Sequence, residues 1–278
     1  MKTTQTLRTT QAGQPVESAQ KQRSLSQFYA PIDEIARNSA SLVASTAGEF
    51  LSNGERYEVK RYLHVGPQGG DTPVRIGIFA GIHGDEPAPS YAIRRLLTLL
   101  EAYPEVARGY CLFFYPVCNP VGFERNTRAS GSERDLNREF WQNSPEPEVG
   151  ILERELREQR FHGIVSLHSD DTSDGLYGFV AGATLTQNLL RPALAEAASV
   201  LPLNHRPQID GFKASEGIIR TGYDGVLSAP SSQRPKPFEI ILESPADAPQ
   251  VLQEQSLLVA LEVILREYRK LLAYAPNL

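Results

Sequence analysis

Short apolar runs that alternate with helical patterns constrain the fold of this chain most strongly. The runs have the length and the flanking residues of buried strands. They occupy residues 74–82, 110–117, 163–167 and 238–242. Segments with apolar residues at helical spacing separate and follow them, at residues 87–103, 147–160, 184–201 and 250–272. Strands that alternate with helices predict an α/β domain with a mixed, mostly parallel twisted sheet and helices on both faces.

The N-terminal part of the chain carries weaker patterns. Residues 28–45 have apolar side chains at roughly helical spacing and predict a helix. Residues 57–65 predict a strand that forms a hairpin with residues 74–82 across a Gly- and Pro-rich turn. The first 27 residues are rich in Thr, Gln and Ser and predict a disordered tail. We therefore expect a tail at residues 1–27 and a single α/β catalytic domain at residues 28–278.

Charge and hydropathy exclude several classes of partner. The net charge is −5 and no Lys- or Arg-rich stretch stands out, which argues against a nucleic-acid surface. No apolar run reaches 18 residues, so no membrane span is expected. The N-terminal residues lack the apolar segment of a secretory signal, and the expected location is the cytoplasm.

Metal-binding side chains follow two of the predicted strands. His83-Gly84-Asp85-Glu86 comes after residues 74–82, and His168 comes after residues 163–167. Two neutral imidazoles and one carboxylate are the ligands of a catalytic zinc ion that keeps a fourth position open for water. Ligands of open α/β sheets bind at the carboxyl ends of strands. A single histidine after a buried strand is usually structural or exposed, so the prediction of one zinc ion depends on the accompanying residues.

Further polar side chains suit a substrate with a carboxylate. Residues 118–147 form the longest stretch without periodicity, and a long loop in a compact domain is usually functional. It contains Arg128, Asn137 and Arg138, and a guanidinium group binds carboxylates through a rigid fork. Glu243 ends the last apolar run, where a carboxylate beside a metal site suits a general base. Asp85 has two readings, an acceptor that orients a metal ligand or a partner of loop amides.

These motifs together resemble a known family. In chain order they are His83 to Glu86, Asn119-Pro120-Val121-Gly122-Phe123, Asn126-Thr127-Arg128, Asp135-Leu136-Asn137-Arg138, Leu167-His168-Ser169 and Glu239 to Glu243. The order is similar to that of zinc metallocarboxypeptidases of the carboxypeptidase A-like family, especially its short bacterial members. The resemblance covers about residues 74–275. Each motif alone is weak, and six in order are specific.

The resemblance implies a role for each matching residue. It implies that His83, Glu86 and His168 bind one zinc ion, a ligand set known from carboxypeptidase A. It implies that Arg128 polarises the scissile carbonyl and stabilises the oxyanion. The residues implied for the other steps are Asn137 and Arg138 as the clamp on the terminal carboxylate, Glu243 as the base that passes a proton from water to the leaving amine, and Tyr223 as the family's loop tyrosine. The sequence around Tyr223 does not match the family closely.

Asp170 and Asp171 depart from the pattern of the digestive enzymes. Two carboxylates beside a metal ligand would favour a substrate that carries an amine. The alternative reading is a solvated loop with turn-forming aspartates. Both readings stay open at this stage.

Three functions are compatible with these residues. The leading one is a metallocarboxypeptidase or related peptide amidase that cleaves an amide next to a free carboxylate, and bacterial relatives include enzymes that trim peptidoglycan peptides. The second is an N-acyl-amino-acid deacylase of the succinylglutamate desuccinylase and aspartoacylase type. Those enzymes usually carry Asn in place of Asp85 and a β-rich domain after the catalytic core, whereas this chain ends soon after Glu243. The third is a non-enzymatic zinc- or ligand-binding protein on the same scaffold.

Overall fold

A mixed sheet of ten strands forms the centre of the computed structural model, which describes residues 22–70 and 72–274. The strand order is β1-β2-β4-β3-β5-β10-β6-β9-β8-β7. The strands are β1 (Leu42–Ser52), β2 (Glu55–Val65), β3 (Val74–Phe79), β4 (Tyr110–Tyr115), β5 (Gly163–Asp170), β6 (Tyr177–Val180), β7 (Gln208–Ile209), β8 (Phe212–Ser215), β9 (Ile218–Ile219) and β10 (Phe238–Pro245).

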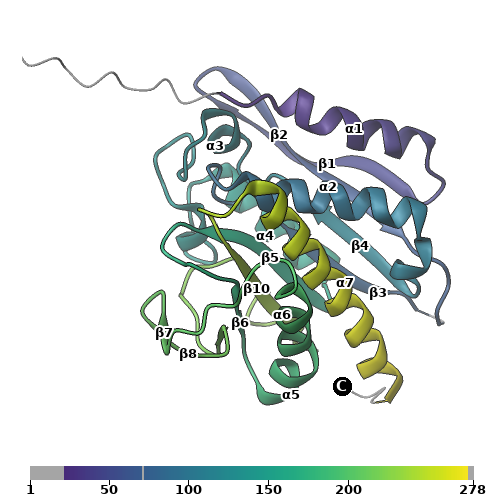
Figure 1. The fold of residues 1–278 in the computed structure, drawn as a ribbon. Helices are drawn as coiled ribbons and strands as arrows, with labels where there is room; N and C mark the ends of the chain where they lie inside the picture. The colour runs from purple at the N-terminus through teal and green to yellow at the C-terminus, as the bar shows by residue number, and fades with distance from the viewer. Residues whose placement is uncertain (1–21, 71, 275–278) are drawn as a thin grey trace, which may run out of the picture.

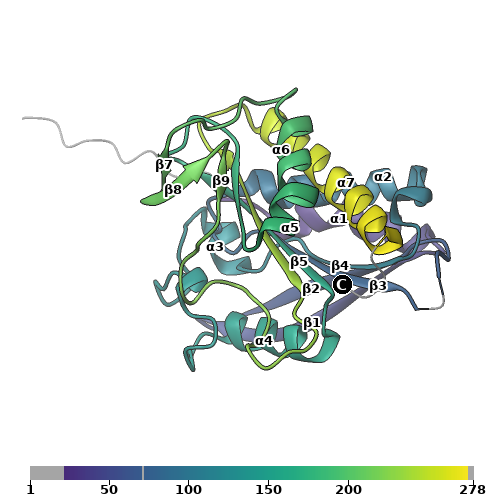
Figure 2. The same ribbon diagram turned by 90° about the horizontal axis from the view of Figure 1, so that it is seen from below.

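The helices lie on both faces of this sheet. They are α1 (Leu25–Asn38), α2 (Pro87–Ala102), α3 (Pro120–Arg125), α4 (Pro147–Gln159), α5 (Ala183–Leu185), α6 (Arg191–Ala197) and α7 (Gln250–Tyr274), with short 3₁₀ turns at Pro104–Ala107 and Leu136–Arg138 and a π-turn at Thr186–Leu190. Figure 2 shows α1, α2, α6 and α7 on one side of the sheet and α4 on the other. Each side encloses its own apolar core. The predicted α/β fold with a helix-covered mixed sheet is confirmed.

Parallel pairing predominates in the middle of the sheet, and β6 and β9 form one further parallel pair beyond it. β4, β3, β5 and β10 run parallel in that order, and β1, β2 and β6 add antiparallel neighbours outside them. β3 and β5 are buried over almost their whole length, as strands covered on both faces must be. Their carboxyl ends lie at one edge of the sheet, where Figure 1 shows the loop that leads to α3. In the β5–β10 register, His168 pairs with Glu243.

The predicted hairpin is wrong. β2 pairs with β1 and β4, so β4 lies between β2 and β3. The prediction missed β1, because Leu42 and Val43 continue the apolar spacing of the preceding helix. That helix ends at Asn38, and the Ser39 hydroxyl accepts hydrogen bonds from the amides of Ser41 and Leu42, which turns the chain into the strand.

The start of the chain also differs from its prediction. Helix α1 begins at Leu25 and is capped by Ser24, so the predicted boundary at residue 28 falls inside the helix. Residues 1–21 of the predicted tail lie outside the part that the structure describes. Within the described residues, no helix is both long and apolar enough to cross a membrane.

Candidate metal centre

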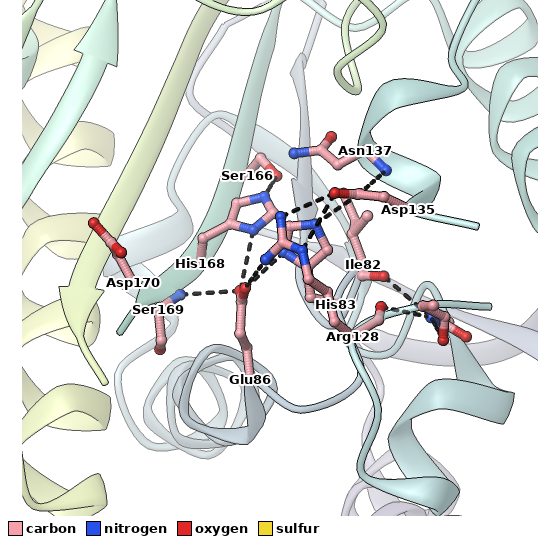
Figure 3. A network of polar contacts seen from close by, with 12 residues as sticks. Ile82, His83, Glu86, Arg128, Asp135, Asn137, Ser166, His168, Ser169 and Asp170 are labelled. Carbon is pink, nitrogen blue, oxygen red and sulfur yellow. Dashed lines mark hydrogen bonds and ion pairs between the residues drawn. The ribbon is translucent and has the colours of Figure 1, made fainter. Parts of the chain in front are cut away.

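The three predicted metal ligands meet at the carboxyl ends of β3 and β5. His83, Glu86 and His168 are all buried, and one ligand atom from each lies within 4.8 Å of the others. Glu86 Oε1 lies 2.6 Å from His83 Nδ1, and Glu86 Oε2 lies 3.1 Å from His168 Nδ1 (Figure 3). Both imidazoles therefore turn their Nδ1 atoms toward one point beside the carboxylate.

The second nitrogen of each imidazole has a partner of its own. His83 Nε2 lies 3.0 Å from Asp135 Oδ1, and His168 Nε2 lies 3.0 Å from Ser166 Oγ. A metal-binding histidine usually engages its other nitrogen in this way, which fixes the tautomer and the ring orientation. The donor set of two imidazole nitrogens and one carboxylate thus fits a zinc-type ion.

Electrostatics in this group favour a charged Glu86. Burial raises the pKa of the Glu86 carboxyl, but His83 and His168 outweigh burial and hold it well below its ordinary value. For His83, burial alone would lower the pKa. The neighbouring carboxylates of Glu86 and Asp135 more than offset burial and raise the pKa to about 9. For His168, burial dominates and lowers the pKa. The amide of Ser169 donates to Glu86 at 3.0 Å and further stabilises the carboxylate.

Asn119 holds the loop that carries the first two ligands. Its side-chain amide donates to the carbonyls of Ile82 at 3.3 Å and Ala129 at 3.1 Å. Its Oδ1 accepts the amide of Gly122 and so caps α3. The loop after β3 is thereby tied to the segment that leads into Arg128.

Arg128 lies directly beside the predicted metal ligands. Its guanidinium donates to Asp135 at 3.0 and 3.2 Å and approaches Glu86 Oε1 at 3.4 Å. Asp135 thus links Arg128 to His83, and these two neighbours hold the pKa of its carboxyl low although burial alone would raise it. Asp135 rather than Asp85 is the carboxylate that orients His83.

The predicted carboxylate clamp lies on the same cavity. Asn137 is buried, and its Oδ1 accepts the amide of Leu227 at 3.0 Å. The Arg138 guanidinium lies 4.1 Å from the centre of the Tyr223 ring. No carboxylate of the residues described here forms an ion pair with Arg138. Tyr223 donates its hydroxyl to the Asp210 carbonyl at 3.1 Å. Burial and the nearby carboxylate of Asp210 raise the pKa of Tyr223 to about 12.

Glu243 lines the same cavity from β10, where it is paired in register with His168. Burial raises the pKa of its carboxyl well above the ordinary value, and the negative charges of Glu86, Asp170 and Asp210 raise it further. A cation beside Glu86 would lower this pKa again, because bound ions are the largest charges in such sites.

Asp170 and Asp171 both line the cavity, but they differ in their contacts. Asp170 accepts the amide and the hydroxyl of Thr172 through Oδ1 and the hydroxyl of Tyr177 through Oδ2. Asp170 thus makes the contacts of a turn-forming aspartate and also lines the cavity. Asp171 is exposed. Sequence reasoning missed Asp210, which reaches the same cavity from the turn between β7 and β8.

The predicted site residues surround one cavity of about 400 Å³. Its walls contain the three ligands together with the residues predicted for the later steps, which are Arg128, Asn137, Arg138, Asp170, Asp171, Tyr223 and Glu243. The loop next to it is anchored by Phe140, which is fully buried, and by the Trp141 indole, which donates to the Ser228 carbonyl. Every predicted site residue thus lies on one surface.

Comparisons with known proteins agree with this geometry. The model of the succinylglutamate desuccinylase/aspartoacylase catalytic domain matches residues 74–203. Among proteins of curated function, no match to the chain was found.

Several solved structures share the fold. A predicted metallopeptidase from Shewanella amazonensis is 18% identical with a TM-score of 0.72, and the match covers 87% of this chain and 92% of that one. A metallo-carboxypeptidase from Pseudomonas aeruginosa, in complex with (2-guanidinoethylmercapto)succinic acid, is 15% identical with a TM-score of 0.68, covering 90% and 70%. Carboxypeptidase A from Helicoverpa armigera is 16% identical with a TM-score of 0.66, covering 94% and 76%. The chain therefore has a zinc carboxypeptidase-like fold related to the succinylglutamate desuccinylase and aspartoacylase group.

Proposed function

We propose that this protein is a zinc-dependent hydrolase that cleaves a C-terminal amide next to a free carboxylate, as a metallocarboxypeptidase or peptide amidase. One observation carries the proposal. A single cavity brings together the His83–Glu86–His168 group, the Glu243 carboxylate, and the guanidinium groups of Arg128 and Arg138. This is the set of groups that peptide hydrolysis at a chain end needs.

The metal would be held by His83, Glu86 and His168. Zinc in such a site activates water and polarises a carbonyl oxygen. Arg128 would stabilise the negative charge that develops on that oxygen, since its guanidinium already lies beside Glu86 and is held by Asp135.

Glu243 would move the proton. Its carboxyl faces the ligand group from β10, and its raised pKa reflects burial near other carboxylates. We propose that it accepts a proton from the attacking water and delivers it to the nitrogen of the leaving amine.

Asn137 and Arg138 would bind the terminal carboxylate of the substrate. The Asn137 carbonyl oxygen is engaged by Leu227, which leaves its NH₂ as the group to donate. Arg138 offers a guanidinium that pairs with none of the described carboxylates, and a fork of this kind binds a carboxylate through two bonds. Tyr223 packs against that guanidinium and would close over the bound substrate.

Asp171, with Asp170 and Asp210, would favour a positive charge on the substrate. All three carboxylates line the cavity, and the charges of Asp170 and Asp210 raise the pKa of Glu243. The Pseudomonas aeruginosa neighbour was solved with a ligand that combines two carboxylic acid groups with a guanidino group. A peptide end with a free carboxylate and an amine, such as a diamino acid, has the same combination of charges.

The second candidate function is an N-acyl-amino-acid deacylase, which the match of residues 74–203 favours. It would use the same metal ligands, Glu243 and clamp. However, a succinyl group carries its own negative charge into a cavity where three further carboxylates surround Glu243, Glu86 among them. That repulsion favours peptides over succinylated amino acids.

The test is a substrate screen with purified protein. Peptides with varied C-terminal residues, N-acyl amino acids and muropeptides are incubated with and without a chelator, and the released amine is measured. We expect release from peptides that is lost with chelator and restored by zinc. Release from succinyl-amino acids alone would support the deacylase. Zinc binding with no release from any substrate would support a non-enzymatic role.

A further inference from the structure

Arg23 contacts the metal-ligand loop from outside the predicted catalytic domain. Its Nη1 donates to the Gly84 carbonyl at 2.5 Å and to the Phe123 carbonyl at 3.2 Å, and its Nη2 donates to the Asn126 side chain. The guanidinium also lies 5.1 Å from the centre of the Phe123 ring. One half-buried side chain thus joins two segments that lie far apart in the sequence.

Both of these segments belong to the proposed site. Gly84 separates the ligand His83 from Asp85 and the ligand Glu86. Asn126 ends α3 in a left-handed conformation, with φ of 57°, and stands two residues before Arg128. Arg23 therefore connects the loop that carries the metal ligands to the start of the segment that carries the oxyanion arginine.

Arg23 complements the inner contact made by Asn119. Asn119 holds the Ile82 carbonyl, and Arg23 holds the Gly84 carbonyl, so both carbonyls that flank His83 are tied to the α3 segment. The two backbones pack without intervening side chains here. A Cβ atom on Gly84 would lie 1.9 Å from the Gly122 carbonyl carbon. The backbone at Gly84 thus lies in direct contact with the backbone at Gly122, and side-chain hydrogen bonds hold the two segments on both sides of His83. The two segments therefore have little room to move relative to each other.

The position of Arg23 is itself fixed by the fold. Its amide donates to the Glu124 carbonyl at 2.9 Å, and α1 follows directly after the Ser24 cap. Phe28 of α1 packs against Phe123, with ring centres 5.2 Å apart. The described residues just ahead of α1, 22–24, therefore lie against α3 (Figure 1).

We propose that Arg23 is a positioning residue of the site, which holds Arg128 at its working distance from the metal ligands. Arg23 itself touches neither the predicted ligands nor the residues that line the cavity, so it would act only through the segments that it holds. The inference therefore rests on the proposed function of that site. A small displacement of a catalytic group can lower the rate by up to about 100-fold. Residues 1–27, which sequence reasoning assigned to a tail, would then include a residue that positions the site.

The test compares Arg23→Ala and Arg23→Lys with Arg94→Ala. Arg94 is the matched control, because its guanidinium packs on Tyr91 and Phe28 near α1 but contacts no site residue. We expect Arg23→Ala to lower kcat about 10- to 100-fold with little change in KM. We expect Arg94→Ala to lose a similar amount of thermal stability and keep its kcat. Millimolar guanidinium chloride should restore part of the kcat of Arg23→Ala, and Arg23→Lys should lie between.

Two results would overturn the inference. One is an unchanged kcat in Arg23→Ala. The other is a loss of kcat that Arg94→Ala shows equally and that guanidinium does not restore.

A second readout does not depend on hydrolysis. The visible spectrum of bound Co²⁺ reports ligand geometry, and we expect its bands to differ between wild type and Arg23→Ala but not between wild type and Arg94→Ala. Identical spectra for all three proteins would contradict the positioning role. If wild type binds Co²⁺ and hydrolyses nothing, the proposed function fails, and the spectra still decide the role of Arg23.

Discussion

The two walls of the cavity both carry carboxylates, but these carboxylates have different partners and opposite pKa shifts. The metal wall comprises His83, Glu86, Arg128 and His168, together with Asp135, which contacts two of them. Each of its carboxylates accepts from an imidazole and from an arginine. On the acidic wall, which comprises Asp170, Asp171, Asp210 and Glu243, no ion pair forms among the residues that the structure describes.

The pKa shifts follow this difference. The pKa of Glu86 is held low by its neighbouring histidines, although burial alone would raise it. The pKa of Glu243 is raised by burial and by the other carboxylates. The carboxylates of the metal wall are balanced by histidine and arginine side chains of the protein. A bound cation or a positively charged substrate would balance the carboxylates of the acidic wall. The comparison teaches that burial alone does not set the state of a carboxylate, since the available partners decide it.

The largest effect should come from removing the proton acceptor of the acidic wall. We expect Glu243→Gln to lower kcat by about 10³-fold or more, because general-base catalysis is lost while the metal ligands remain intact. Metal content by atomic absorption should equal that of wild type. Full activity in this variant would show that Glu243 is not the base, and loss of the metal would place it on the metal wall.

Asp135→Asn tests whether the metal wall depends on its outer partners. The amide keeps the shape of the side chain but weakens its bonds to His83 and Arg128. We expect the affinity for zinc to fall about 10- to 100-fold, measured by competition with a chromogenic chelator. Asp174→Asn, outside the cavity in an exposed pair with Arg206, should leave the affinity unchanged. Equal affinities in wild type and Asp135→Asn would contradict the assignment.

A buried carboxylate outside the cavity tests the physical cause of the raised pKa. Glu148 in the first turn of α4 is 1% exposed, and burial, with a smaller effect of Glu146, raises its pKa from 4.5 to about 7. The folded protein then binds more protons than the unfolded one between about pH 4.5 and 7, so this group lowers stability as the pH rises through that window.

The measurement is the free energy of urea unfolding of Glu148→Gln minus that of wild type. We expect this difference to be about 2–3 kcal/mol more favourable to the variant at pH 8 than at pH 4. Glu158→Gln, on the exposed face of the same helix, should not change the pH dependence. Parallel pH profiles for wild type and Glu148→Gln would show that burial alone does not raise a carboxyl pKa here.

The smallest effects should come from single charges of the acidic wall. Asp171→Asn and Asp210→Asn should each lower kcat/KM for peptides with an amine-bearing side chain about 2- to 5-fold relative to neutral peptides, because exposed pairs contribute little. The difference should shrink at high salt. An unchanged ratio of the two kcat/KM values would remove these residues from substrate selection.

The sequence predicted the components that depend on local pattern. Buried strands at β3, β5 and β10 show as continuous apolar runs, and polar residues at their ends mark His83, His168 and Glu243. Because parallel strands bring their carboxyl ends to one edge, these residues could be placed together before the structure was known. The predicted helices over α2, α4 and α7 are also confirmed, because apolar residues at helical spacing are a local pattern too.

The sequence could not predict contacts that join separate segments. β1 continued a helical pattern, and the partner of β2 proved to be β4, which follows β3 in the chain. Asp210 reaches the cavity only because β9, β8 and β7 continue the sheet beyond β6. Arg23 contacts Gly84 across 61 positions of sequence. Neither Asp210 nor Arg23 has a local sequence signal that distinguishes it from an ordinary loop residue.

The sequence by itself determined the α/β class, the three candidate metal ligands and the candidate base, because periodicity and residue type at strand ends are local properties. The tertiary structure alone decided which charges face one another. It placed Asp135 on His83, left Glu243 among carboxylates and brought Arg23 to the ligand loop. The physical reason is that a pKa or a hydrogen bond depends on distance and burial, which neighbours in space set and neighbours in sequence do not.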